Sequence, residues 1–83
     1  MHKVVWESSA CKDLTKIDRV VAKKIEVGVE TKLAKNPYKG KPLTGQYKGF
    51  HRYRFSKYRV IYKIKEKVLI ILVVKVSHRK EVY

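Results

Sequence analysis

The sequence predicts an α+β domain in which two helices cover one face of an antiparallel sheet. Two patterns carry this prediction: apolar residues recur every four positions over residues 21–33, and β-branched and aromatic residues dominate residues 47–76. A segment rich in glycine and proline separates the two halves. The 83 residues are enough for one hydrophobic core and too few for a second. We therefore expect a single domain that spans residues 1–83.

The first half of the chain is expected to begin with a strand and a short helix. Residues 2–6 are rich in valine and are typical of an opening strand. Ser8 or Ser9 offers an N-terminal cap for the helix that follows. Ile17 and Asp18 indicate a break and a new cap, so a second helix is expected to start there.

The second helix carries one apolar stripe that must face the core. The stripe consists of Val21, Ile25, Val29 and Leu33. Gly28 costs a helix about 1 kcal/mol relative to alanine and is consistent with close approach of the sheet. The pair Asn36-Pro37 is expected to end the helix.

The second half is expected to form a loop followed by three strands. Residues 38–49 contain Pro42 and three glycines, which predicts a loop with turns. Strand-like runs joined by very short links follow and predict an antiparallel meander: residues 47–55, 58–64 and 68–76, linked at 56–57 and 65–67.

The charge balance points to a polyanionic partner. Lysine and arginine number 21 against 7 acidic residues, for a formal charge of +14. Such charge repels itself, and nucleic acid, an anionic membrane or an acidic protein would offset it. Residues 48–59 interleave basic and aromatic side chains, which favours nucleic acid over a merely solvated basic surface.

Cysteine usage and hydropathy favour the reducing cytoplasm. The single cysteine, Cys11, cannot form an internal disulfide and is interpreted as a packing residue in a helix. No charged-then-apolar leader is visible at the N-terminus. The longest apolar run, residues 68–74, is far shorter than the roughly 20 residues needed to span a bilayer. We expect no membrane partner.

Three arginines are predicted to gather on one face of the sheet. Alternation along the first strand of the meander puts Arg52 and Arg54 on the same face. A two-residue turn at residues 56–57 would place Arg54 opposite Arg59. Because like charges across a strand pair are destabilising, the cluster is better explained as a phosphate-binding floor than as three independent solvated arginines.

The position of His78 depends on the length of the last link, since a one-residue change reverses every side chain of the strand. A two-residue turn at residues 66–67 would place Leu69, Ile71 and Val73 in the core. It would also turn His78 toward the face that carries Arg59.

The residue types favour RNA cleavage without a metal or a cofactor. The seven acidic residues are scattered, and the sequence contains no metal-ligand spacing, P-loop or dinucleotide fingerprint. RNA supplies its own nucleophile, the 2′-hydroxyl, so a protein need only align it, stabilise charge and move two protons. Arginine is too basic to transfer protons, which leaves His78 and Tyr83 as candidates. We expect no small-molecule ligand.

The segment PLTGQYKGFHRYRFSKYRVIYKI, a valine-rich strand and the ending SHRKEVY resemble the RelE side of the RelE/ParE toxin superfamily. The predicted order of elements also follows that family, so the resemblance covers nearly the whole chain. It implies a toxin of a type II toxin-antitoxin system that enters the ribosomal A site and cleaves mRNA there, leaving a cyclic phosphate. It also implies a bound antitoxin that silences the toxin.

The resemblance carries roles over to several residues. Arg52 and Arg54 stand where RelE-like toxins have basic residues near the scissile bond, and Arg59 resembles the phosphate-stabilising arginine. The C-terminal catalytic stretch corresponds to His78, Arg79 and Tyr83. Some RelE toxins have lysines in place of the first two arginines, where a lysine has been proposed as the base, so the histidine gains importance here. Further basic residues are expected to bind RNA: Lys48, Lys57, Lys63 and Lys80.

Two other functions stay open. The ParE branch of the superfamily has the same fold but inhibits DNA gyrase by binding, and a basic RNA-binding module would have no activity. For the toxin, an acidic amphipathic antitoxin segment is the expected protein partner. Val21, Ile25 and the flank of the long helix would supply its docking groove if the core does not consume them.

Overall fold

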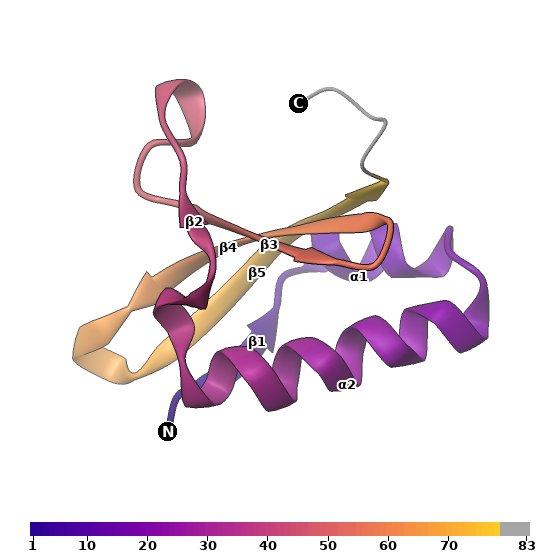
Figure 1. The fold of residues 1–83 in the computed structure, drawn as a ribbon, viewed down its shortest axis with the longest axis horizontal. Coiled ribbons are helices and arrows are strands. Elements are labelled where there is room, and N and C mark those ends of the chain that lie inside the picture. Colours follow the sequence, from indigo (N-terminus) through magenta and orange to yellow (C-terminus); the bar gives the residue numbers. More distant parts are fainter. Residues whose placement is uncertain (79–83) are drawn as a thin grey trace.

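In a computed structural model that describes residues 1–78, a five-stranded sheet and one long helix form the body of the protein (Figure 1). The elements follow in the order β1 (Lys3–Trp6), α1 (Ser8–Thr15), α2 (Arg19–Lys35), β2 (Lys41–Pro42), β3 (His51–Phe55), β4 (Tyr58–Lys65) and β5 (Ile70–His78). The spatial order of the strands is β1-β5-β4-β3-β2. Strand β1 runs parallel to β5, and the other neighbours are antiparallel. The predicted α+β class is confirmed, and the parallel β1 makes the sheet mixed.

The two helices begin differently. Helix α1 has Glu7 at its N-cap position, without a side-chain cap, so the prediction that Ser8 or Ser9 caps it is wrong. Helix α2 is capped as expected, because the Asp18 carboxylate accepts a hydrogen bond from the Val20 amide at 3.2 Å. Proline after Asn36 cannot continue the helix, which ends at Lys35.

The core lies between α2 and the centre of the sheet. Ile25, Val29 and Leu33 of the predicted stripe are fully buried and pack against strands β4 and β5. Full burial of one such side chain contributes about 1.5–3 kcal/mol. Gly28 faces Phe55 of β3 so closely that an added Cβ would collide with the ring. The close approach of the sheet, with which Gly28 in the sequence is consistent, is found in the structure, and it brings β3 onto the helix.

The glycine- and proline-rich segment is more ordered than a loop. It contains two short 3₁₀ turns and strand β2, which pairs with β3 through Lys41↔Arg52 and Pro42↔His51. Proline is tolerated in β2 because β2 is an edge strand, where the missing N–H breaks no ladder. Strand β3 begins at His51, four residues later than the sequence predicts, because residues 45–47 form one of the 3₁₀ turns.

A buried tyrosine ties this segment to the sheet. The Tyr62 hydroxyl donates to the Pro37 carbonyl at 2.7 Å and accepts from the Gly40 amide at 3.0 Å. Burial raises the pKa of Tyr62 to about 12. The neutral hydroxyl therefore serves both as donor and as acceptor at the point where the chain turns from α2 into β2.

The link between β4 and β5 is longer than a two-residue turn. Glu66–Val68 forms a 3₁₀ turn and Leu69 adopts a left-handed conformation with φ 53°, so β5 starts at Ile70 rather than at residue 68. Ile71 and Val73 are fully buried, as predicted. Leu69 is 50% exposed, so its expected place in the core is wrong.

Two further expectations concern α1 and the membrane. Cys11 is exposed, so its interpretation as a packing residue is wrong. Ala10, its neighbour, is the residue of α1 that is fully buried.

Within residues 1–78, no helix is both long enough and apolar enough to cross a membrane.

Candidate nucleic-acid interface

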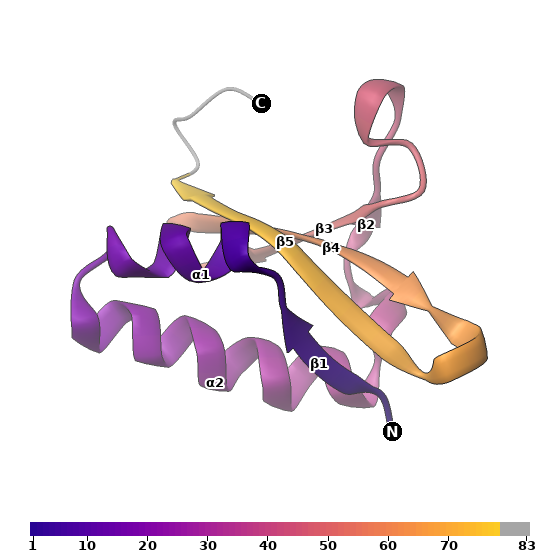
Figure 2. The ribbon, with the colours of Figure 1, turned by 180° about the vertical axis from the view of Figure 1, so that it is seen from behind.

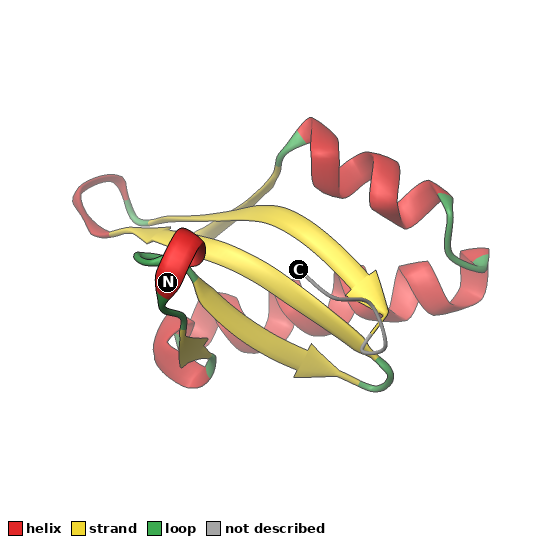
Figure 3. Cartoon of the chain, turned by 90° about the horizontal axis from the view of Figure 1, so that it is seen from above, coloured by secondary structure: helices red, strands yellow, loops and turns green. Residues whose placement is uncertain are grey.

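The hairpin of β3 and β4 adopts the register expected from a two-residue turn. Arg54 lies directly opposite Arg59, and Phe55 lies opposite Tyr58. Tyr53 and Phe55 pack against the core, so the alternating arginines Arg52 and Arg54 lie on the face of the sheet turned away from α2. We call this the open face. Seen from above, its strands lie in front of α2 (Figure 3).

Basic side chains gather on the open face. Pairing adds two lysines that the sequence analysis missed: Lys41 lies opposite Arg52, and Lys75 lies opposite Ile61 of β4. Of the acidic residues in the described part of the chain, none belongs to β2, β3, β4 or β5. Like charges face each other in the pairs Lys41↔Arg52 and Arg54↔Arg59, and a polyanion lying across the strands would offset their repulsion. The positions of Lys41 and Lys75 follow from strand pairing, which the sequence does not reveal.

An arm rises from the open face where β2 passes into β3 (Figure 1). The arm comprises residues 43–50 and is closed by a hydrogen bond from the Leu43 amide to the Phe50 carbonyl at 2.9 Å. The rings of Tyr47 and Phe50 meet edge to face, 6.2 Å apart, and the Lys63 ammonium lies 5.7 Å from the Phe50 ring centre. Aromatic rings beside cations suit single-stranded nucleic acid, whose bases stack and whose phosphates pair with cations.

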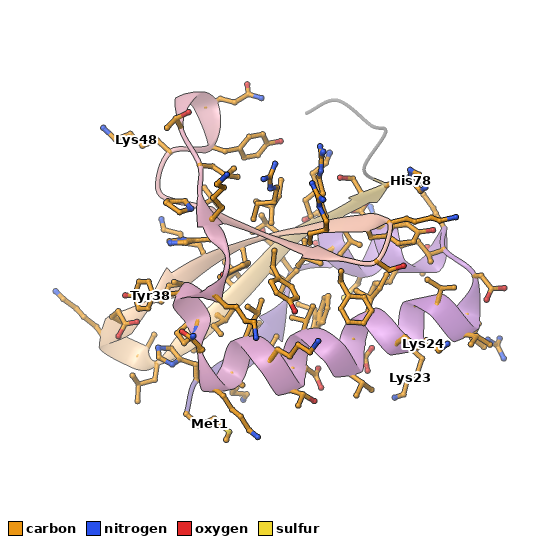
Figure 4. All side chains as sticks on the ribbon, in the orientation of Figure 1. Met1, Lys23, Lys24, Tyr38, Lys48 and His78 are labelled. Carbon is orange, nitrogen blue, oxygen red and sulfur yellow. The ribbon has the colours of Figure 1, made fainter. Side chains whose placement is uncertain are left out.

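The four lysines expected to bind RNA are not all gathered in one place. Lys48 is exposed on the arm (Figure 4), and Lys63 reaches the base of the arm at Phe50. Lys57 occupies the β3–β4 turn, at the opposite end of the hairpin. Lys48 and Lys63 thus flank one end of the arginine cluster, and Lys57 lies beyond the Arg54–Arg59 pair.

His78 does not lie with the arginines. It pairs with Tyr58, and the two rings meet edge to face at 5.4 Å between centres. Tyr58 packs against the core, so His78 is on the helix side of the sheet, and Ser77 takes the place opposite Arg59. The predicted position of the histidine on the arginine face is therefore wrong.

A β-bulge causes this difference. Tyr62 pairs with Val73, but its neighbour Ile61 pairs with Lys75, so Val74 is an extra residue in β5. One extra residue exchanges the two faces for everything that follows it. The end of β5 also borders a cavity of about 230 Å³, whose lining includes His78, Asp13 and Lys16.

A separate apolar groove runs along α2 and the edge of β3. Its volume is about 490 Å³, and its lining includes Val27 and Phe55 together with Lys23, Lys24 and Lys32. Figure 4 shows Lys23 and Lys24 on the side of the sheet opposite to Lys48. The groove is therefore an apolar floor bordered by lysines.

Val21 and Ile25, which were expected to line a docking groove, belong to the core. Ile25 is fully buried and Val21 packs against the core cluster. The flank of α2 was expected to contribute as well, and Val20 and Val27 are 62% and 49% exposed there. Their spacing of seven residues puts both on one side of α2.

Three predicted site residues, Arg79, Lys80 and Tyr83, lie outside the described residues. Residues 1–78 contain no group of three or more histidine, cysteine or acidic side chains placed to hold a metal ion.

Comparisons with known proteins point to toxins of the RelE and ParE type. A family model described as the ParE toxin of the type II toxin-antitoxin system matches residues 4–83. The toxin-antitoxin complex RelBE2 of Mycobacterium tuberculosis contains a chain that is 25% identical over 96% of this chain and 93% of its own, with a TM-score of 0.90. The isolated RelE toxin of E. coli is 15% identical, covers 99% of this chain and 88% of its own, and has a TM-score of 0.78.

An archaeal relative also has this fold. A chain of the RelE-RelB complex of Pyrococcus horikoshii is 20% identical over 98% of both chains, with a TM-score of 0.68. A search of curated protein sequences gave no match.

Proposed function

This chain belongs to the ParE toxin family of type II toxin-antitoxin systems, and from its open face we propose that it is a metal-independent endoribonuclease that cleaves mRNA in the ribosomal A site. The observation that carries the proposal is the cluster of Arg52, Arg54 and Arg59 on a sheet face whose strands hold no acidic residue in the described part of the chain. The proposed activity belongs to one toxin domain over residues 1–83. A ribosomal substrate also implies action in the cytoplasm.

The proposed reaction uses the 2′-hydroxyl of the RNA as nucleophile. The 2′ oxygen forms a bond to phosphorus as the bond from phosphorus to the 5′ oxygen breaks, which leaves a cyclic phosphate and a free 5′-hydroxyl. A base takes the 2′ proton and an acid supplies one to the leaving oxygen. Negative charge grows on the phosphoryl oxygens in the transition state, and Arg54 and Arg59, facing each other, supply fixed positive charge for it.

The open face is wider than the arginine cluster, and we assign its outer lysines to binding. Lys48 and Lys63 at the arm and Lys57 at the turn would pair with phosphates on either side of the scissile bond. Phosphate contacts position the strand without reading its bases. Lys80 is proposed for the same role.

Proton transfer is assigned to the C-terminal stretch. Because His78 pairs with Tyr58 on the helix side, Tyr83 is the stronger candidate for proton transfer and His78 takes a supporting place at the end of β5. Arg79 is proposed as a further phosphate ligand.

His78→Gln is expected to lower the cleavage rate by less than about tenfold, whereas loss of a true proton-transfer group costs roughly 10²–10⁴-fold. The physical reason is that its imidazole is turned away from Arg59 by the bulge in β5. A pH-rate profile of the variant beside the wild type checks this. A loss of about 100-fold or more, together with a flattened acidic limb of the profile, would return proton transfer to the histidine.

The activity itself is tested on programmed ribosomes. Purified protein is added to ribosomes that carry a defined mRNA, and the 3′ ends of the products are mapped. Cuts within the A-site codon that end in a cyclic phosphate support the proposal. Absence of cuts from folded protein contradicts it.

Inhibition of DNA gyrase by binding is the second candidate function, favoured by the match to the ParE family model. A supercoiling assay with purified gyrase separates the two. Inhibited supercoiling without mRNA cleavage would assign this chain to the gyrase-binding branch. RNA binding that depends on salt, with neither activity, would indicate a non-catalytic RNA-binding module.

The protein partner is a cognate antitoxin, since two of the similar structures are complexes of a toxin with its antitoxin. We propose that an acidic amphipathic helix of the antitoxin docks in the groove between α2 and β3. The exposed Val20 and Val27 and the ring of Phe55 would receive its apolar side, and the lysines at the rim would pair with its carboxylates.

Val27→Asp is expected to weaken antitoxin binding by at least about tenfold, because it places a charge in the apolar floor of the groove and repels an acidic helix. Calorimetric titration of the toxin with the antitoxin measures the loss, and mRNA cleavage by the free variant should stay unchanged. Lys67→Glu, on the distant β4–β5 turn, is the matched control and should bind normally. Equal affinity of the Val27 variant and the wild type would remove the groove as the docking surface.

A further inference from the structure

The last part of β5 has, within the described residues, no strand on one side. Strand β1 pairs with β5 only as far as Trp6↔Val73, and β5 continues to His78. The Glu7 amide makes the last backbone bond of this edge, to the Val73 carbonyl at 2.9 Å. Backbone groups beyond that point need other partners, because unpaired amides and carbonyls inside a fold are costly.

Where β1 ends, two side chains of α1 form hydrogen bonds with the backbone of β5. The Ser9 hydroxyl donates to the Val74 carbonyl at 2.7 Å, and the Asp13 carboxylate accepts from the Val76 amide at 2.9 Å. Ser9 and Asp13 are four residues apart and therefore lie one above the other on the same side of the helix. Figure 2 shows α1 running beside the second half of β5, beyond the end of β1.

One of these bonds is made to the bulge and the other lies just after it. Val74 is the extra residue, and Val76 is the first residue after it that returns to the core. Without the bulge, Lys75 would turn toward the core and Val76 would turn toward the open face. Burial of an unpaired lysine is costly, so packing of the core favours the strand with the bulge. Helix α1 then supplies hydrogen-bond partners for backbone groups on the edge of the bulged strand.

We propose that Ser9 and Asp13 are positioning residues for the RNA-cleaving site. They hold β5 in the bulged course that sets Ser77 opposite Arg59 and His78 opposite Tyr58. They thereby fix the end of β5, from which the stretch with Arg79 and Tyr83 follows. This inference rests on the proposed ribonuclease function. Neither residue belongs to the sheet face that would bind RNA, so neither touches the substrate.

A role in folding alone would give a different pattern of effects. Helix α1 also docks through Ala10, which is fully buried, and through Leu14, which packs against the core. Loss of one hydrogen bond at the partly exposed edge should therefore leave the fold in place. Loss of the hydrogen bond should lower the turnover rate rather than RNA binding, because misplacement of a reacting group by about 1 Å can cost 10²-fold in rate.

The test compares Asp13→Ala with Asp13→Asn on programmed ribosomes. Asparagine keeps a side-chain oxygen that accepts from the Val76 amide, and alanine does not. We expect the alanine variant to lose about tenfold in kcat with KM within about twofold, and the asparagine variant to stay within about twofold of the wild type in both. Ser9→Ala removes the second bond from an exposed position and should lower kcat in the same way.

Amide exchange gives a readout that does not depend on cleavage. The Val76 amide should lose protection in Asp13→Ala and keep it in Asp13→Asn, and the His78 ring resonances should move only in the alanine variant. Lost protection with unchanged kcat would overturn the proposal, as would an asparagine variant as slow as the alanine one. If Asp13→Ala fails to fold, Ser9→Ala decides by the same criteria. If the wild type cuts no mRNA, the ribonuclease assignment fails, and exchange and the His78 resonances still decide whether α1 positions the end of β5.

Discussion

Arg59→Ala is expected to lower the rate of mRNA cleavage by about 100- to 1000-fold, the usual cost of removing one preorganised group that stabilises transition-state charge. Arg59 lies on the open face, opposite Arg54 on one side and Ser77 on the other. It is outside the core cluster, so the fold should survive the substitution. Single-turnover cleavage on programmed ribosomes measures the effect, with circular dichroism to confirm the fold.

Two variants make this result specific. Arg59→Lys keeps the charge but loses the planar fork that binds a phosphate through two hydrogen bonds, so its rate should fall between alanine and the wild type. Lys57→Ala removes a cation from the adjacent turn and should cost less than about tenfold, as expected for a residue that only helps to bind RNA. Full activity in a folded Arg59→Ala protein would eliminate the phosphate-floor mechanism.

Tyr62→Phe is expected to lower the free energy of unfolding by about 1–3 kcal/mol, because it strips the buried Pro37 carbonyl and Gly40 amide of their shared partner. The ring itself remains, so packing changes little. Urea unfolding at neutral pH measures the loss. Tyr38→Phe is the matched control: this tyrosine is 61% exposed and donates to Glu66 at the surface, so its loss should stay within about 0.5 kcal/mol.

The same tyrosine should make stability depend on alkaline pH. Its pKa is raised in the fold to about 12 from the ordinary value of 10, so the folded state favours the neutral hydroxyl. Its contribution is complete below pH 10 and is lost as the pH rises from 10 toward 12. The stability difference between wild type and Tyr62→Phe should shrink over that range. A difference that stays constant up to pH 12 would contradict this assignment.

The features that the sequence predicted correctly depend on neighbours in the chain. The stripe of α2 follows from a four-residue spacing, and Asp18 caps that helix because a cap acts within its own first turn. A two-residue turn at Ser56-Lys57 sets the pairing of Arg54 with Arg59. The arginine cluster, the centre of the candidate site, therefore follows from local spacing along the chain.

Features that depend on contacts between distant segments were not predictable. Strand β2 exists because Lys41 and Pro42 pair with β3, and this pairing also brings the extra lysine onto the open face. The apolar groove requires Phe55 to meet Gly28 across the whole length of the loop. Such contacts are chosen by packing, which leaves no periodic trace in a single sequence.

The sequence by itself thus determined the α+β class, the long helix, the hairpin register and the arginine face, because each follows from local spacing and turn length. Only the tertiary structure decided which way His78 points. That direction depends on the bulge at Val74, which lets Val76 turn into the core. Ser9 and Asp13, more than sixty residues earlier in the chain, bind the backbone at Val74 and at Val76. A single extra residue in a strand exchanges its two faces, and the free energy that selects it comes from packing and hydrogen bonds made only when the helix has docked.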